Sequence, residues 1–174
     1  MKTRSIVFSD LMIDAIKLGI KSQTRRVIKQ KHIGDLHPQV AGSDSEKPII
    51  MPAEPEQASM LGWLLANSPY GKVGDRLTCN DLILEITDLR IQRVRDISAR
   101  DAVREGLHTL PASGRYCLQP GMQYFGEASH DSREVFSWLW DDINGDGSWN
   151  QNPWVFVIEF QRVTGSTSVK GGEA

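Results

Sequence analysis

The sequence predicts a single α+β domain, a small and mostly antiparallel β-barrel with helices packed outside it. Three observations favour this class. The chain of 174 residues has the length of one domain. Short β-prone runs alternate with segments of helical period, and tight reversals separate consecutive strands, as antiparallel pairing requires. Apolar residues make up 40% of the chain, which suffices for a core without cross-links.

The N-terminal part is expected to form a strand, a helix and a second strand. Residues 5–8 are β-prone, and Ser9 or Asp10 is placed to cap the helix that follows. Gly19 is a typical helix end, because glycine adopts the left-handed conformation without steric cost. The next strand is expected over 24–28.

Residues 31–69 differ in composition from the rest of the chain. They are rich in proline, glycine and polar residues, with one short apolar piece at 60–65. A loop of this length inside a compact domain is typically a functional lid or a disordered insert, and we expect a partly ordered lid. The single domain is expected to span 1–163, and 164–174 to form a disordered tail.

The second half of the chain carries the clearest local signals. Asn80 and Asp81 are typical of a tight reversal between two strands. Ser98 is positioned to cap a short helix, with Asp101 three residues on, and Gly106 is positioned to end it. The remaining strands and helices are expected, in chain order, over 77–79, 82–94, 99–105, 132–143 and 154–163.

Charge and apolar patterning restrict the class of protein. The net charge of −2 argues against a general nucleic-acid coat. Residues 1–40 are locally basic, which suits either an anionic ligand or a solvated surface. No apolar run approaches the ~20 residues that span a bilayer, so a cytoplasmic protein without a membrane partner is expected.

No metal or cofactor is expected. Cys79 and Cys117 form no spaced pair, so neither a disulfide framework nor a zinc ribbon is indicated. The four histidines share no metal-binding spacing. The run from Asp142 to Gly147 imitates the start of a calcium loop, but Pro153 occupies the position of its essential glutamate.

Three segments, taken in order, resemble one known family. They are Gly19-x-Lys21-x-x-Thr24-x-Arg26, Val94-x-Asp96-Ile97-Ser98-x-x-Asp101-Ala102-x-x-Glu105-Gly106 and Trp154-Val155-Phe156-Val157-Ile158-Glu159-Phe160. With a Gly-Asp-Arg-Leu strand between the first two, they resemble the ASCH domain, which is a PUA-like β-barrel. The stretch from Leu139 to Gly145, before Asn-Pro-Trp, is similar to ASCH proteins of bacteriophages and prophages.

The resemblance implies a protein that acts on a modified nucleoside or on RNA. Some small bacterial ASCH proteins are amidohydrolases that remove the acetyl group from the exocyclic amine of acetylcytidine. Their catalytic set is a lysine, a threonine three residues on and a glutamate on the following helix. These residues correspond here to Lys21, Thr24 and Glu105.

Two other functions remain open. Some ASCH proteins are ribonucleases, and many are regarded as RNA-binding modules without catalysis. In a binding module, Lys21, Arg25 and Arg26 would contact phosphates while a pocket holds a base. In every version we expect the ligand to meet Gly19, Arg25, Arg26 and Tyr70. The oligomeric state is not indicated by the sequence.

The expected chemistry requires an activated threonine. A hydroxyl is a poor nucleophile until a base takes its proton, and a lysine is a base only when neutral. Burial and the neighbouring arginines would lower the pKa of Lys21, whereas Glu105 would raise it. Alternatively, a charged Lys21 stabilises the oxyanion. Side chains alternate along a strand, so Lys21 and Thr24 converge only if 19–23 forms a turn.

The tryptophans and phenylalanines have helical or strand spacing and are expected to be mostly core. Tyrosines in loops are better candidates for contact with a ligand. These are Tyr70, Tyr116 and Tyr124.

Overall fold

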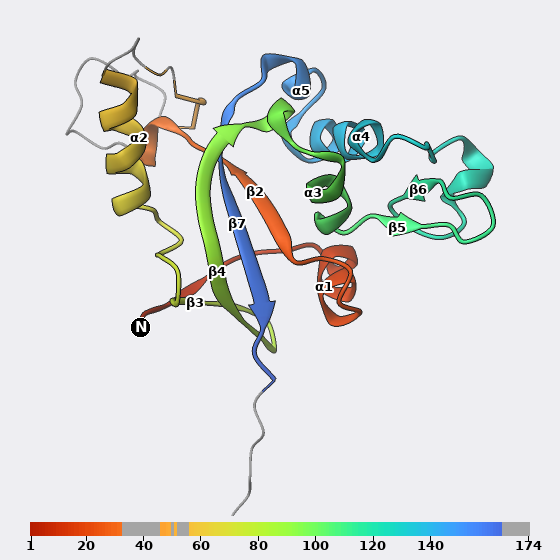
Figure 1. Ribbon diagram of the computed structural model, residues 1–174, viewed down its shortest axis with the longest axis horizontal. Helices are drawn as coiled ribbons and strands as arrows, with labels where there is room; N and C mark the ends of the chain where they lie inside the picture. The colour runs from red at the N-terminus through yellow and green to blue at the C-terminus, as the bar shows by residue number, and fades with distance from the viewer. Residues whose placement is uncertain (33–45, 50, 52–55, 165–174) are drawn as a thin grey trace, which may run out of the picture.

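The computed structural model describes residues 1–32, 46–49, 51 and 56–164, and these form an α+β domain (Figure 1). The larger sheet contains β1 (Thr3–Ser5), β2 (Gln23–Val27), β3 (Arg76–Cys79), β4 (Leu82–Arg93) and β7 (Trp154–Arg162). The helices are α1 (Asp10–Lys17), α2 (Glu56–Ala66), α3 (Ala99–Arg104), α4 (Ser132–Asn144) and α5 (Ser148–Gln151). A small second sheet pairs β5 (His108–Thr109) with β6 (Tyr116–Cys117) and projects beyond α3 and α4 (Figure 1).

The larger sheet is open in the described residues. Its strand order is β1-β3-β4-β7-β2, and the only parallel pair among these strands is β1 with β3. The mostly antiparallel sheet is therefore confirmed. The expected barrel is not confirmed, because β1 and β2 lie at opposite edges and no described pairing joins them.

A β-bulge divides the long strand β4 into two parts. The register with β7 shifts between Ile86, which pairs with Phe160, and Asp88, which pairs with Glu159. Before the shift the even-numbered residues face the core, and after it Leu89 is the residue on the apolar face. The extra residue thus turns β4 by one position relative to β7.

Buried residues lie on both faces of the sheet at its centre and under the flanking helices. Four consecutive residues of β7, from Val155 to Ile158, are fully buried, as expected for a central strand covered on both faces. Helices α3 and α4 pack together beside β2, whereas α2 lies beyond β4 (Figure 1). The edge strand β2 is therefore the strand of the sheet that lies beside these two helices.

The first predicted strand is displaced. Residues 5–8 were expected in a strand, but β1 is Thr3–Ser5, pairing with Arg76 to Thr78 of β3. Ile6 and Phe8 follow the strand and are buried in the core. Ile6 and Phe8 are apolar because they pack in the core. A short apolar pattern in the sequence looks the same for such a buried segment and for a strand.

Other expectations have mixed outcomes. The apolar piece at 60–65 lies within the longer helix α2, and the irregular stretch 107–130 contains β5 and β6. The strands at 77–79, 82–94 and 154–163 and the helices at 99–105 and 132–143 are confirmed within one or two residues. Much of the expected lid (33–45, 50 and 52–55) and the tail from 165 lie outside the described residues.

Among the described residues, every helix is too short or too polar to serve as a membrane-spanning segment.

The predicted cap of α3 is present. Ser98 Oγ accepts a hydrogen bond from the Asp101 backbone N–H at 3.1 Å. Glu105 is the C-cap residue of this helix, and Gly106 follows with φ of +114°. The cap and the positive φ together define the length of α3 and so the position of Glu105.

We predict that Ser98→Ala lowers the free energy of unfolding by about 1 kcal/mol, because a helix N–H loses its acceptor. Ser9→Ala is the matched control, since Ser9 is the N-cap of α1 but its side chain makes no capping bond. Urea denaturation of both variants measures the difference. Equal losses of stability would contradict a specific role for the Ser98 cap.

Candidate active site

The segment after α1 forms the turn on which the site depends. Gly19 has φ of +75°, and the N–H groups of Ile20 and Lys21 both donate to the carbonyl of Ala15, at 2.9 and 3.0 Å. The chain thus reverses before β2 begins at Gln23. The direction of the Lys21 side chain is set by this turn and not by strand alternation. A turn over 19–23 is the condition expected from the sequence for Lys21 and Thr24 to converge.

Lys21 and Glu105 form a buried ion pair. Lys21 Nζ donates to Glu105 Oε2 at 3.2 Å, to the Glu105 carbonyl at 2.7 Å and to the Gln23 carbonyl at 2.8 Å. The two side chains are 3% and 5% exposed. Burial lowers the pKa of Lys21, the Glu105 carboxylate opposes this, and Arg26 and Arg25 lower it further. These are the directions expected from the sequence.

Arg25 completes a cluster of one carboxylate between two cations. Its Nη1 donates to Glu105 Oε1 at 2.7 Å and to Gln23 Oε1 at 2.6 Å, and its side chain is fully buried. The guanidinium lies over the Phe136 ring at 5.9 Å. Its Nε and Nη2 have no hydrogen-bond partner among the described residues. Nη2 lies 3.6 Å from Asp101 Oδ2, an ion pair, so the Nε–H is the donor of Arg25 that has neither a hydrogen bond nor an ion pair among the described residues.

A pocket of about 360 Å³ lies against this cluster. Lys21, Thr24, Arg25, Arg26 and Glu105 line it together. The other walls come from the segment between β1 and α1, from α1, from the end of β2 and the residues after it, from Tyr70 and from helix α4. These residues are Val7, Phe8, Ser9, Met12, Val27, Lys29, Lys31, His32, Tyr70, Phe136, Leu139, Trp140, Ile143 and Asn144. The volume suits a small molecule or one nucleoside.

Thr24 faces this pocket with an uncommitted hydroxyl. Thr24 is 4% exposed, and its hydroxyl forms no hydrogen bond with any described residue. Thr24 pairs with Ile158 and Arg25 with Val157, so their side chains leave β2 on opposite faces. The pocket contains both because β2 is an edge strand, and the cavity extends around its outer edge.

Aromatic rings line the part of the pocket near Arg26. The Arg26 guanidinium lies 5.1 Å from the Phe8 ring centroid and donates to the Val7 carbonyl at 2.6 Å. Lys21 Nζ lies 5.7 Å from the same ring. Burial raises the pKa of Tyr70, with Arg26 and Lys31 opposing the shift, so its hydroxyl stays protonated at neutral pH.

Unsatisfied donors concentrate at this pocket. Four of the seven buried side-chain polar atoms that lack a partner in the described part of the chain belong to pocket residues. They are Arg25 Nε, Arg25 Nη2, Arg26 Nε and Trp140 Nε1. Buried donors without acceptors are costly, so this grouping indicates a site for a ligand that supplies acceptor oxygens or nitrogens.

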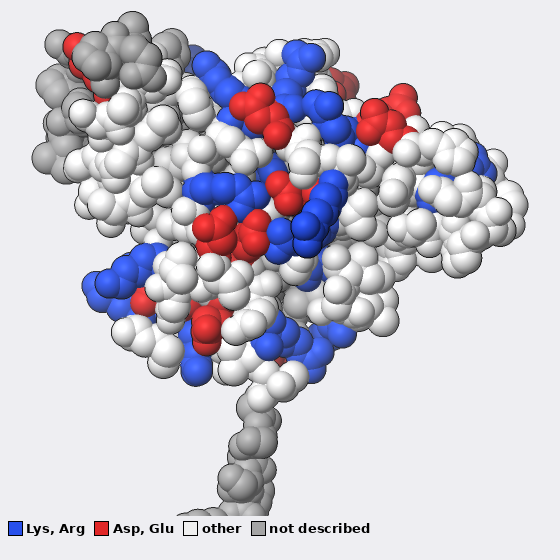
Figure 2. Space-filling view, viewed as in Figure 1, with Lys and Arg blue, Asp and Glu red and all other residues white. Residues whose placement is uncertain are grey.

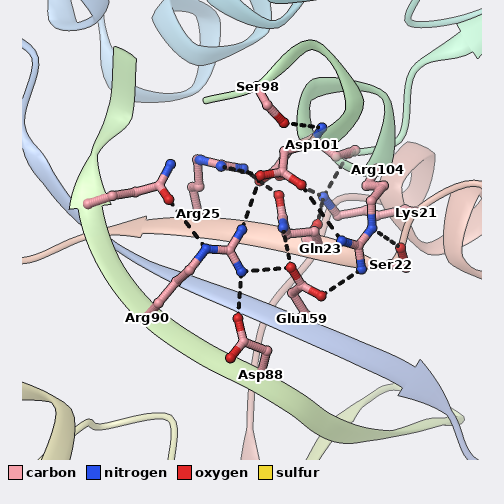
Figure 3. A network of polar contacts seen from close by, with 12 residues as sticks. Lys21, Ser22, Gln23, Arg25, Asp88, Arg90, Ser98, Asp101, Arg104 and Glu159 are labelled. Carbon is pink, nitrogen blue, oxygen red and sulfur yellow. Dashed lines mark hydrogen bonds and ion pairs between the residues drawn. The ribbon is translucent and has the colours of Figure 1, made fainter. Parts of the chain in front are cut away.

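A network of charges connects the buried cluster to the surface (Figure 3). Gln23 Nε2 donates to Glu159, which also accepts from Arg90 at 2.6 Å and from Arg104 at 2.8 Å. Burial alone would raise the pKa of Glu159, but the bonds from Arg104 and Arg90 outweigh it and lower the pKa to about 2. The network therefore remains ionised at neutral pH.

The surface above this network carries both signs of charge. Figure 2 shows Lys and Arg interspersed with Asp and Glu over the middle of this face, over β4 and β7. A face of mixed charge does not provide the continuous positive potential that a general nucleic-acid coat requires. This agrees with the inference from the net charge of −2.

The structure brings most of the expected site residues together. Lys21 and Glu105 are in contact, and Thr24, Arg25, Arg26 and Tyr70 line the same pocket. Gly19 lies in the turn and is not among the lining residues, so its part in ligand binding stays a prediction.

Sequence reasoning missed three further residues of the site. Gln23 orients Arg25, Phe8 underlies two cations, and Trp140 carries an unpaired buried N–H. Gln23 lies one residue before the strand expected over 24–28, and β2 begins one residue earlier, so alternation puts Gln23 and Arg25 on one face. Tyr116 and Tyr124 do not line this pocket.

Comparisons with known proteins give weak likenesses to solved structures. The hypothetical protein PH0355 is 13% identical, with a TM-score of 0.44 over 94% of this chain and 100% of its own. An ASCH domain from Lactobacillus crispatus is 13% identical, with a TM-score of 0.41 over 92% of this chain and 79% of its own. Protein PF0455 from Pyrococcus furiosus is 13% identical, with a TM-score of 0.38 over 95% and 100%.

No family model matches the chain, and the search of curated proteins found no significant relative. Scores and identities this low are too weak to assign a family or an activity.

We predict that Glu105→Gln lowers the pKa of Lys21 further, because the variant removes the carboxylate that opposes the effect of burial. Titration of the lysine ¹³Cε resonance measures this shift. Asp131→Asn, at the exposed N-cap of α4, is the control and leaves the Lys21 resonance unchanged. An unchanged or raised pKa in Glu105→Gln would show that the carboxylate does not control this lysine.

The low pKa of Glu159 predicts an acid-dependent stability. A carboxyl whose folded pKa of about 2 lies below its unfolded value stabilises the protein above the unfolded pKa. The free energy of unfolding of wild type is therefore higher than that of Glu159→Gln by on the order of 2–3 kcal/mol at neutral pH. This difference disappears as the pH falls from about 4.5 to 2. Denaturation series across this range measure the difference, with the exposed Glu127→Gln as control. A difference that does not change with pH would contradict the prediction.

Proposed function

We propose that this protein is an amidohydrolase that removes the acetyl group from the exocyclic amine of an acetylated cytidine. One observation carries the proposal: the uncommitted Thr24 hydroxyl lines the same pocket as the buried Lys21–Glu105 pair. A nucleophile, a group able to take its proton and a cavity for the substrate therefore occur together. The resemblance to the ASCH motifs supports the same three residues from the sequence.

The proposed reaction proceeds in two steps. Thr24 Oγ attacks the carbonyl carbon of the acetyl group, and the Lys21–Glu105 pair takes the hydroxyl proton. The carbon–nitrogen bond then breaks, and the pair returns the proton to the amine, which leaves as cytidine. Water hydrolyses the resulting ester of Thr24 and releases acetate. Because the two groups are strongly coupled, the proton belongs to the pair and not to either residue.

Buried cations supply the electrostatic part of the catalysis. The attack places negative charge on the acetyl oxygen, which needs donors that are already positioned. The Nε of Arg25 has no hydrogen-bond partner among the described residues, and Gln23, Glu105 and Asp101 hold its guanidinium in place. Arg25 is therefore the proposed oxyanion donor.

A second candidate is a binding module that holds a modified base without reacting. The observation that favours it is that three acceptors already surround Lys21 Nζ, which suits a permanently charged ammonium. The unpaired donors of the pocket would then bind the base or a phosphate. This candidate predicts affinity for the nucleoside with no release of acetate.

The test is release of acetate from N4-acetylcytidine by the purified chain. We expect Thr24→Val to lower kcat/KM about 100-fold or more, because it removes the nucleophilic oxygen and preserves the shape of the side chain. Thr24→Ser should retain part of the activity. Thr78→Val is the matched control, since Thr78 is a threonine on β3 outside the pocket.

Two outcomes separate the candidates. Absence of acetate release by the intact chain, together with measurable binding of N4-acetylcytidine, would favour the binding module. Equal activity of Thr24→Val and wild type would contradict the role of Thr24 while leaving the reaction itself possible through another nucleophile.

A further inference from the structure

The outer edge of β2 carries backbone groups that have no partner in the part of the chain that the structure describes. Hydrogen bonds run from Phe160 N to the Ser22 carbonyl and from Ile28 N to the Trp154 carbonyl, at 3.0 and 2.9 Å. The register between these two bonds has no shift. In an antiparallel pair, residues alternate between facing the partner strand and facing away, so the N–H and C=O of Arg25 and Val27 point away from β7.

Both ends of this edge are occupied. At one end the Gln23 carbonyl accepts from Lys21 Nζ at 2.8 Å. At the other end the Ile28 carbonyl accepts from Ile49 N at 3.1 Å, and Lys29 forms a bridge with Pro48. Between them, the outward groups of Arg25 and Val27 have no partner among the described residues. The result is a gap of two outward-facing residues, about 7 Å along the strand.

The gap opens into the pocket. Arg25 and Val27 both line it, and Arg25 is 5% exposed, so its backbone is largely removed from solvent. Buried backbone groups are nearly always hydrogen-bonded, and a bound ligand is the natural partner here. An added β-strand does not suit this position, because strands are at least about three residues long and both ends of the gap are closed.

We propose that this gap in β2 binds the hydrogen-bonding edge of a cytosine ring. The inference rests on the proposed function and specifies how its substrate is recognised. The exocyclic N4–H donates to the Arg25 carbonyl, and N3 accepts from the Val27 N–H. A planar ring presents this adjacent donor and acceptor in the plane of the strand, as the gap requires.

The direction of β2 fixes the orientation of the base. Arg25 is nearer than Val27 to the end of β2 where Gln23 contacts Lys21, and its side chain binds Glu105, so the exocyclic amine lies towards the Lys21–Glu105 pair. The sugar then lies towards Val27 and the basic residues that follow β2. Uridine carries a donor at N3 and an acceptor at O4, which opposes the same backbone groups, so the gap discriminates against uracil.

The first test is nuclear magnetic resonance of the ¹⁵N-labelled full chain with cytidine and with uridine. We expect cytidine to shift the Arg25 and Val27 amide resonances and to slow their exchange, and to bind at least about 10-fold more tightly than uridine. The amides of Thr24 and Arg26 are already bonded to β7 and serve as internal controls. Binding of cytidine without perturbation of Arg25 and Val27, equal binding of uridine, or no binding of cytidine would each overturn the proposal.

The second test is Val27→Pro, which deletes one outward N–H and no ladder bond. Val27→Ala retains the N–H and controls for loss of the side chain. We expect cytidine affinity to fall at least about 10-fold in Val27→Pro relative to Val27→Ala, at similar thermal stability. Equal affinities would contradict recognition by this edge.

These readouts are independent of hydrolysis. Base recognition with no acetate release would contradict the amidohydrolase and leave the recognition site standing. Acetate release by wild type, together with an unchanged affinity of Val27→Pro for cytidine, would contradict recognition by this edge and leave the amidohydrolase proposal standing.

Discussion

The buried carboxylate of Glu105, held between Lys21 and Arg25, is the interaction on which the site depends. Its three members come from the turn after α1, the edge strand β2 and the C-terminus of α3. Removal of one partner from such a cluster leaves a buried charge uncompensated, at a cost of about 3–5 kcal/mol. The cluster therefore requires these three elements to meet in one arrangement, and the pocket is the space that this arrangement leaves beside them.

An edge strand makes this arrangement possible. A central strand would have both its backbone edges paired, and its two faces would be separated by neighbouring strands. In β2 the pocket contacts Thr24 on one face and Arg25 on the other because no further strand of the described residues covers the outer edge. Edge strands are usually protected against unwanted pairing. Here Lys21 and the segment around Pro48 protect the ends and leave the middle accessible.

Local sequence signals predicted many of the helix ends and turns of this fold. The Ser98 cap, the helix end at Gly106 and the reversal at Asn80 each depend on neighbouring residues, and all three are present. The barrel was not confirmed, because closure depends on the relation between the first and last strands of the sheet, which no local pattern encodes. Gln23 was missed for a similar reason: its partner Glu159 is 136 residues away in the chain.

The bulge in β4 has a consequence for how this protein can change during evolution. The apolar residues of β4 are even-numbered up to Ile86 and include Leu89 after it, so Thr87 shifts the phase of the pattern. Because Thr87 is the extra residue of the bulge, its deletion would place Asp88 directly after Ile86 in regular register with β7, and would leave Leu89 on the apolar face and Arg90 in the charged network. Deletion of another residue of β4 would exchange the faces of the residues on one side of it. We therefore expect homologues to lose a residue of β4 at Thr87 more readily than at other positions between Leu82 and Arg93.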